Sequence, residues 1–231
     1  MARAALGGLF ALALSACQTP WPEAVLRQAV AAPEGSPVVA EAAPEIASTP
    51  LSTATAEVVS LKGRIAAVLV ERAPALQPVD RARVAGAIEN AWHNHHVDPV
   101  LALAVIHQES NFRPDAHGPG GSIGLMQVRP FVAADVARRH NIPWSGAKTL
   151  LDPAANVQIG TCYLGEMLEM FHDPALAIAA YNMGPYRVRR LVARGHSPKP
   201  VYLVSVLKHF QGLASEFGPV APEAFEEALA E

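Results

Sequence analysis

The spacing of hydrophobic residues divides the 231-residue chain into parts of different character. Residues 4–14 form an apolar run that is too short to span a bilayer as a permanent anchor. Residues 18–55 are rich in Ala, Pro, Glu, Ser and Thr, so they bury too little apolar surface to offset the entropy lost on ordering. Apolar residues return with helical spacing in residues 56–72, which predicts a short helix before Pro74 and Pro78.

The region from Asp80 onward predicts a compact helical domain. Asp80 is expected to cap a helix that runs to His96. The Asp98-Pro99 pair starts the next helix, because Asp accepts backbone N–H groups and Pro fits the first helical position. The sequence shows no alternating strand pattern and no internal repeat, so the predicted fold is all-α with six or seven short helices. The remaining predicted helices cover residues 131–140, 153–171, 174–181, 186–194 and 198–215.

These patterns predict four segments: a signal peptide at 1–16, a disordered Ala/Pro-rich tether at 17–79 that includes the short helix, the helical domain at 80–218 and an acidic tail at 219–231. The net charge of −3 differs from the strongly basic balance of dedicated nucleic-acid binders. The predicted domain is mildly basic, with 13 Lys and Arg against 11 Asp and Glu. The tail carries four glutamates and no basic residue, which indicates a solvated end and not a site.

The end of the first apolar run indicates a lipid anchor. Its last residues, Leu14-Ser15-Ala16-Cys17, resemble a bacterial lipobox, in which cleavage precedes a lipidated cysteine. An ordinary secretory peptide followed by a chance cysteine is the alternative. Acyl chains on Cys17 would hold the protein on the periplasmic face of a bacterial membrane without a transmembrane helix. Gln18 replaces the Asp of the inner-membrane retention signal, which favours the outer membrane in a diderm.

Other residues with the chemistry of metal or anion sites have simpler interpretations. Cys162 has no thiol partner once Cys17 is acylated, and its apolar helical context indicates a buried structural thiol. The adjacent histidines occupy different faces of a helix and have no acidic or thiolate companions in sequence, so no metal site is predicted. A cluster of arginines after Tyr186 is expected to form a solvated face. These histidines are His93, His95 and His96, and the arginines are Arg187, Arg189, Arg190 and Arg194.

The helix that begins at Pro99 ends in a carboxylate with a chemical use. Residues 100–106 are apolar on nearly every side, so this helix is expected to run through the core. Glu109 follows them, and desolvation there would raise its pKa, as a general acid requires. The alternative is a solvated glutamate near a helix end, which is the common case.

Three short motifs favour the catalytic interpretation of Glu109. In order and spacing they resemble the soluble-lytic-transglycosylase family, and matches to the helix between the motifs support the resemblance. Together the matches cover residues 80–217. The motifs are Glu109–Ala116, Gly121–Pro130 and Ala180–Gly184, and the intervening matches are Asp152-Pro153, Asn156, Gly160 and Tyr163-Leu164.

The resemblance implies a lysozyme-like α-domain that cleaves the β-1,4 bond between N-acetylmuramic acid and N-acetylglucosamine in peptidoglycan. Glu109 matches the catalytic glutamate, and Gln127 matches a glutamine of the glycan groove. Tyr181 matches a tyrosine that hydrogen-bonds the catalytic carboxyl. Ser110 and Asn182 would support the same region, with helix-end capping as the alternative role.

The same family chemistry needs one carboxylate. A usual glycosidase has a second carboxylate, but the nearest acids, Asp115 and Asp135, occupy no motif position. In the family the substrate assists itself and forms a 1,6-anhydromuramyl end, without a metal or cofactor. This chain departs from the family at Gly118 (usually Ser), Ser122 (usually Ala) and Arg129 (usually apolar), which affects substrate contacts and not the catalytic glutamate.

The sequence therefore predicts a lytic transglycosylase that acts on peptidoglycan glycan strands. A muramidase that hydrolyses the same bond and an inactive glycan-binding scaffold are the alternatives. Exolytic or endolytic action stays open, as does the oligomeric state. The sequence also leaves open a role in general wall turnover or in a secretion, conjugation or flagellar apparatus.

Overall fold

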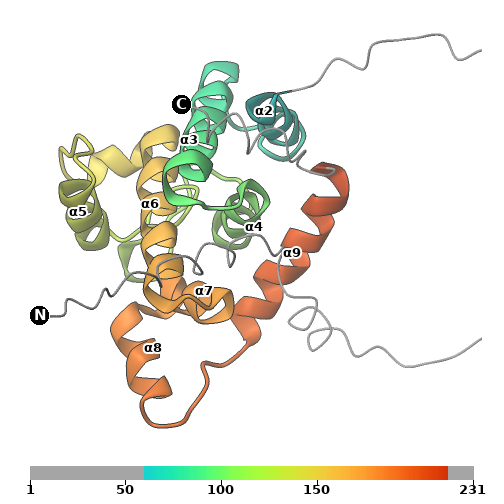
Figure 1. Ribbon diagram of the computed structural model, residues 1–231. Helices are drawn as coiled ribbons and strands as arrows, with labels where there is room; N and C mark the ends of the chain where they lie inside the picture. The colour runs from blue at the N-terminus through green and yellow to red at the C-terminus, as the bar shows by residue number, and fades with distance from the viewer. Residues whose placement is uncertain (1–59, 218–231) are drawn as a thin grey trace, which may run out of the picture. The chain divides into compact units, whose positions relative to one another are not determined.

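The computed structural model describes residues 60–217, and its regular elements in this range are helices (Figure 1). The only β-type pairings among these residues are isolated bridges of Ile123 with His117 and Val128. The predicted all-α fold is confirmed for this part of the chain. The predicted signal peptide, Cys17, most of the predicted tether and the predicted acidic tail lie outside the described residues.

The helix boundaries follow the prolines and aspartates of the sequence. Seven of the described helices fall in the predicted domain, and an earlier helix precedes them. Short 3₁₀ segments cover Pro119–Gly121 and Ala147–Leu151. The α-helices are α2 (Leu61–Arg72), α3 (Pro78–His95), α4 (Pro99–Ser110), α5 (Pro130–Arg139), α6 (Pro153–Phe171), α7 (Pro174–Met183), α8 (Pro185–Val192) and α9 (Val201–Phe217).

Aspartate caps begin several of these helices. Asp98 accepts hydrogen bonds from the backbone N–H groups of Val100 (2.7 Å) and Leu101 (3.0 Å), as the sequence predicts. Asp80 is not a cap, because α3 begins earlier at Pro78, and proline is preorganised for the first helical position. Asp80 instead lies in the first turn of α3, where it pairs with Arg83.

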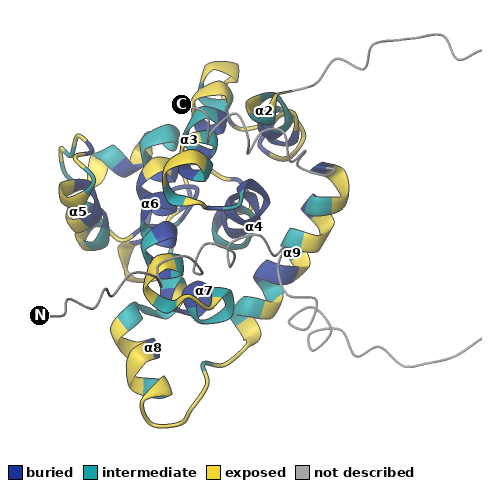
Figure 2. Ribbon diagram, viewed as in Figure 1, coloured by how far each residue is buried: buried dark blue, intermediate teal, exposed yellow. Residues whose placement is uncertain are grey.

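Helix α4 is the centre of the domain. Every residue from Pro99 to Ile106 is buried, and Figure 2 shows this helix enclosed while α8 is largely exposed. Among the described elements, α4 packs most extensively against α9, and α3 packs most extensively against α6. Because its apolar side chains are covered on all sides, α4 is held firmly and presents its C-terminal end to the surface.

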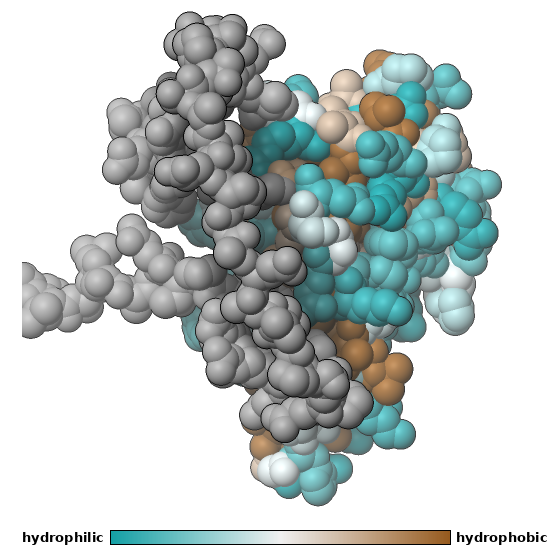
Figure 3. All heavy atoms as spheres, turned by 90° about the vertical axis from the view of Figure 1, so that its right-hand side faces the viewer, coloured by the Kyte–Doolittle hydropathy of each residue, from teal (hydrophilic) through white to brown (hydrophobic). Residues whose placement is uncertain are grey.

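The surface on the side of α9 is mixed in character. Figure 3 shows that the described atoms on this face are mainly hydrophilic, with separate hydrophobic areas. Exposed apolar residues on α2 and α9 are Val70, Val201 and Val204. None of the helices within residues 60–217 combines the length and hydrophobicity that membrane crossing requires.

Candidate active site

The C-terminal end of α4 turns sharply and leaves Glu109 at the edge of the core. Asn111 and Phe112 both have positive φ angles (51° and 59°), which is uncommon for residues with a side chain. Burial of Phe112, which is 2% exposed, holds this turn in place. Ser110 is buried, and its hydroxyl donates to the carbonyl oxygen of Ile106 at 3.1 Å. This bond lies within the last turn of α4, so Ser110 supports the helix that carries Glu109.

A cavity of about 1250 Å³ lies at this end of α4. Four of the residues predicted for the site line it together, although they come from three separate motifs. Ser110 does not line the cavity. Arg129, one of the departures from the family pattern, is exposed and also lines it. The four predicted residues are Glu109, Gln127, Tyr181 and Asn182.

The environment of Glu109 favours its protonated form. Burial raises the pKa of Glu109 above its ordinary value, while a hydrogen bond from Tyr202 acts in the opposite direction. The Tyr202 hydroxyl donates to Oε1 of Glu109 at 2.5 Å. The net direction is upward, so Glu109 stays a proton donor at a higher pH than an exposed glutamate does.

The hydrogen bonds of the two tyrosines correct the sequence interpretation. Tyr181 was expected to bond the carboxyl of Glu109, but its hydroxyl donates to the carbonyl oxygen of Met126 at 2.8 Å. Tyr202, which is 93 residues from Glu109 in sequence and belongs to none of the motifs, makes the bond to the carboxyl instead. Burial, followed by the charge of Glu109, raises the phenol pKa of both tyrosines well above its ordinary value, so both remain donors.

Gln127 ties the loop of the second motif together. Its Nε2 donates to the carbonyl oxygens of Ala116 and Gly124, both at 2.9 Å. Its Oε1 accepts a hydrogen bond from Ser122 at 2.9 Å. With φ of 48°, Gln127 also has a strained backbone that these bonds help to maintain. The side chain lines the cavity in an orientation fixed by its loop partners.

Two departures from the family pattern are linked through Gln127. A Cβ atom at Gly118 would lie 2.1 Å from Gln127 Oε1 and 2.6 Å from Ser122 Oγ. The hydrogen bond between Ser122 and Gln127 therefore occupies the space that a side chain at position 118 would need. In this chain, the hydroxyl that contacts Gln127 Oε1 comes from Ser122.

The helix between the motifs carries the buried amide that holds this loop. Asn156 is fully buried on α6, and its Oδ1 accepts from the backbone N–H of Met126 at 2.9 Å. Its Nδ2 donates to Ile123 (2.8 Å) and Leu150 (3.0 Å) carbonyl oxygens. Gly124 has a φ of 81°, and a Cβ there would lie 2.2 Å from Asn156 Nδ2. The glycine of the second motif is therefore needed for this close approach.

Further carboxylates line the cavity, and two of them are engaged by arginine. Asp135 is exposed, and hydrogen bonds from Arg138 and then Arg139 lower its pKa. Burial opposes ionisation of Glu166, but hydrogen bonds from Arg139 (2.8 and 2.6 Å) and His140 outweigh it and lower its pKa. Glu169 lines the cavity as well, whereas Asp115 does not.

Comparison with known proteins places these features in a family. Residues 86–200 match the model of the transglycosylase SLT domain. The soluble lytic murein transglycosylase of Escherichia coli K12 is 41% identical over 90 residues, which are 38% of this chain and 14% of that protein. The membrane-bound lytic murein transglycosylase C of Shigella sonnei is 33% identical over 116 residues, or 46% of this chain and 32% of that protein. The chain thus spans only a minor part of the length of these relatives.

Among solved structures, the 70 kDa soluble lytic transglycosylase SLT70 of Escherichia coli is similar at 24% identity and a TM-score of 0.47. The match covers 71% of this chain and 30% of SLT70. Residues 86–200 of this chain, which the family model matches, contain all three motifs, from Glu109 to Gly184, and the α6 residues that support them. Within the chain, residues 86–200 therefore belong to the transglycosylase SLT domain family.

Proposed function

We propose that this protein is a peptidoglycan lytic transglycosylase and that Glu109 is its single catalytic acid and base. The observation that carries the proposal is the placement of a carboxyl with a raised pKa in the wall of a cavity of about 1250 Å³. Relatives of the domain carry the names of soluble and membrane-bound lytic murein transglycosylases. A cavity of this size accommodates a glycan strand, and the protonated carboxyl supplies the acid for its glycosidic oxygen.

The reaction follows from one carboxyl acting twice. Protonated Glu109 donates its proton to the glycosidic oxygen as the bond to the anomeric carbon of N-acetylmuramic acid breaks. The N-acetyl group of the same sugar stabilises the anomeric carbon. The 6-hydroxyl oxygen then forms a bond to that carbon, and Glu109 takes up the hydroxyl proton. The products are a free 4-hydroxyl and a 1,6-anhydromuramyl end, and Glu109 is protonated again.

The hydrogen bonds around Glu109 suit both halves of this cycle. Burial keeps the carboxyl protonated for the first step, while the bond from Tyr202 stabilises the carboxylate that exists between the steps. Tyr181 acts on the site indirectly, because its hydroxyl donates to the Met126 carbonyl and so holds the loop that carries Gln127. We assign Gln127 and Asn182 to the glycan-facing wall of the cavity.

The muramidase alternative requires a second carboxylate that activates water. Asp135 and Glu166 line the cavity, but both are held in ion pairs with arginine. An ionised carboxylate in such a pair is a weak base, which favours intramolecular attack by the 6-hydroxyl. An inactive scaffold would not need a desolvated carboxyl in the wall of its cavity.

The deciding experiment is product analysis. Purified sacculi are digested with the full chain, and the released muropeptides are weighed by mass spectrometry. Anhydro ends, lighter by one water than hydrolytic ends, support the transglycosylase. Reducing N-acetylmuramic ends would identify a muramidase. Glu109→Gln keeps the shape but not the proton, so activity should fall by about 10²–10⁴-fold. An active Glu109→Gln protein with an unchanged circular-dichroism spectrum would overturn the assignment of Glu109.

The proposal extends to the anchor. The lipobox-like segment ends at Cys17, and acylation of that residue would attach the domain to the periplasmic face of the membrane, most simply the outer membrane. One relative of the domain is named a membrane-bound transglycosylase. The Ala/Pro-rich residues 18–55 would act as a tether that lets the domain reach glycan strands away from the lipid surface.

A further inference from the structure

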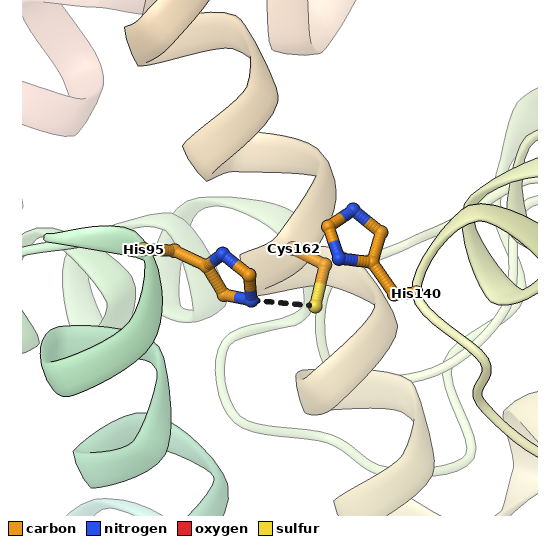
Figure 4. Close-up of side chains that lie close together, drawn as sticks. All are labelled: His95, His140 and Cys162. Carbon is orange, nitrogen blue, oxygen red and sulfur yellow. Dashed lines mark hydrogen bonds between the residues drawn. The ribbon is translucent and has the colours of Figure 1, made fainter.

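Three potential metal ligands meet outside the cavity wall, although they are far apart in sequence. His95 comes from the last turn of α3, His140 caps the C-terminus of α5, and Cys162 lies in the middle of α6. Figure 4 shows the two imidazole rings on either side of the sulfur. One ligand atom from each residue can be chosen so that all three lie within 4.8 Å of one another.

We propose that His95, His140 and Cys162 bind one transition-metal ion, with Zn²⁺ the best match. Two imidazole nitrogens and a thiolate are a donor set that zinc prefers. With Zn–N and Zn–S distances of about 2.1 and 2.3 Å, ligand atoms around a tetrahedral zinc lie about 3.5 Å apart. His95 Nε2 and Cys162 Sγ are already 3.4 Å apart, so small side-chain rotations complete the site. A water molecule would take the fourth position.

The hydrogen bonds behind His140 prepare it for metal binding. Nε2 of His140 lies 2.8 Å from Oε1 of Glu166, and Arg139 holds the Glu166 carboxylate through two bonds of 2.8 and 2.6 Å. A proton on Nε2 that is shared with this carboxylate leaves Nδ1 as the nitrogen with a free lone pair. Metal-binding histidines typically have such a carboxylate on their second nitrogen. Glu166 therefore orients the ligand without itself binding the metal.

The backbone of α6 lets His95 approach the thiol. A Cβ at Gly165 would lie 2.9 Å from the Cβ of His95, so glycine is required where α3 and α6 come together. The rings of His95 and His140 are nearly perpendicular, with centroids 5.1 Å apart, which leaves the space beside the sulfur accessible to both. Burial lowers the pKa of His95 and raises that of the Cys162 thiol to about 11. Metal binding therefore releases the thiol proton to solvent.

The proposed site differs from the sequence interpretation of the histidines. His93, His95 and His96 were predicted to form no metal site, and of these three only His95 belongs to the group. His140 and Cys162 complete it through the packing of α3, α5 and α6. A metal bound here would link these three elements, so it should stabilise the folded state by an amount that rises with the logarithm of the metal concentration above its Kd.

Cobalt provides the probe, because Co²⁺ takes the geometry of zinc and absorbs light when a thiolate binds it. The full chain with Cys17→Ser has Cys162 as its sole thiol, since the sequence contains two cysteines. We expect one Co²⁺ per chain, an intense thiolate-to-cobalt absorption band, and loss of that band when Zn²⁺ is added. Zn²⁺ should also raise the midpoint of thermal unfolding, and Glu166→Gln should weaken Co²⁺ binding by about 10–100-fold.

The variants separate this site from the other histidines of the chain. Cys162→Ser should abolish the charge-transfer band, and His140→Ala should weaken Co²⁺ binding while leaving the thiol in place. His93→Ala is the matched control, since His93 is exposed on the same helix, and it should bind Co²⁺ as the parent does. Circular dichroism establishes that each variant is folded. A parent protein without the band, or a band that persists in Cys162→Ser, would overturn the proposal. These readouts are independent of wall-lytic activity.

Discussion

The link between Gly118, Ser122 and Gln127 yields the sharpest prediction about the cavity wall. In Gly118→Ala the new Cβ would lie 2.1 Å from Gln127 Oε1, which is far inside contact distance. The backbone at Gly118 is extended (φ −121°), so the cost is purely steric. Gln127 must move and can lose up to three hydrogen bonds, to Ala116, Gly124 and Ser122. At about 0.5–1.5 kcal/mol each, the free energy of unfolding should fall by about 1.5–4.5 kcal/mol.

Thermal unfolding followed by circular dichroism measures this loss. For a domain of this size the midpoint changes by roughly 2–4 °C per kcal/mol, so Gly118→Ala should unfold roughly 3–18 °C below the parent. The matched double variant Gly118→Ser/Ser122→Ala returns the hydroxyl to position 118 and removes one of the two clashing atoms. Its loss in free energy of unfolding should be about 0.5–3 kcal/mol smaller than the summed losses of Gly118→Ser and Ser122→Ala. An unchanged midpoint for Gly118→Ala, or additive single effects, would refute the steric link.

The remaining predictions concern the charge of Glu109, the loop and the anchor. The Tyr202 bond lowers the pKa of Glu109, so Tyr202→Phe should raise that pKa. The alkaline limb of the kcat/KM profile against pH should then move to higher pH. An unshifted limb would count against this role of Tyr202. Tyr181→Phe removes a hydrogen bond to the backbone carbonyl of Met126, so turnover of sacculi should slow. The alkaline limb of the pH profile should stay in place, and the muropeptide masses should show the same products. Cys17→Ser should leave catalysis intact and abolish palmitate labelling; a variant that still sediments with outer membranes would contradict the lipid anchor.

How much of this site the sequence reveals depends on how local each contact is. The helix that carries Glu109 could be predicted because Asp98 and Pro99 mark its start and its apolar residues mark its burial. The hydrogen bond from Tyr202 to Glu109 could not be predicted, since it arises only when α9 packs against α4. An aromatic hydroxyl on a partly apolar helix is its only signal in the sequence.

The same distinction explains the histidine cluster and the second motif. His95 can be recognised as a ligand only after α3 and α6 have packed, because its partners are distant in sequence. For the second motif, the resemblance located Gln127 but attributed nothing to Asn156 beyond a match. The structure gives Asn156 three hydrogen bonds to the loop and its surroundings. Motif residues thus include those that hold the loop as well as those that line the cavity.

The position of α9 determines which hydrogen bonds the end of α4 receives. Two adjacent residues at the end of α4 accept hydrogen bonds from α9: Glu109 from Tyr202 and Gln108 from Ser205. Tyr202 and Ser205 are three residues apart, so they lie on one face of α9, and the two bonds together fix the register between the helices. A change that shifts α9 along α4 would remove the hydroxyl from the carboxyl and raise the pKa of Glu109. Burial therefore decides the direction of the Glu109 pKa shift, and a helix that none of the three motifs contains supplies the hydrogen bond that opposes it.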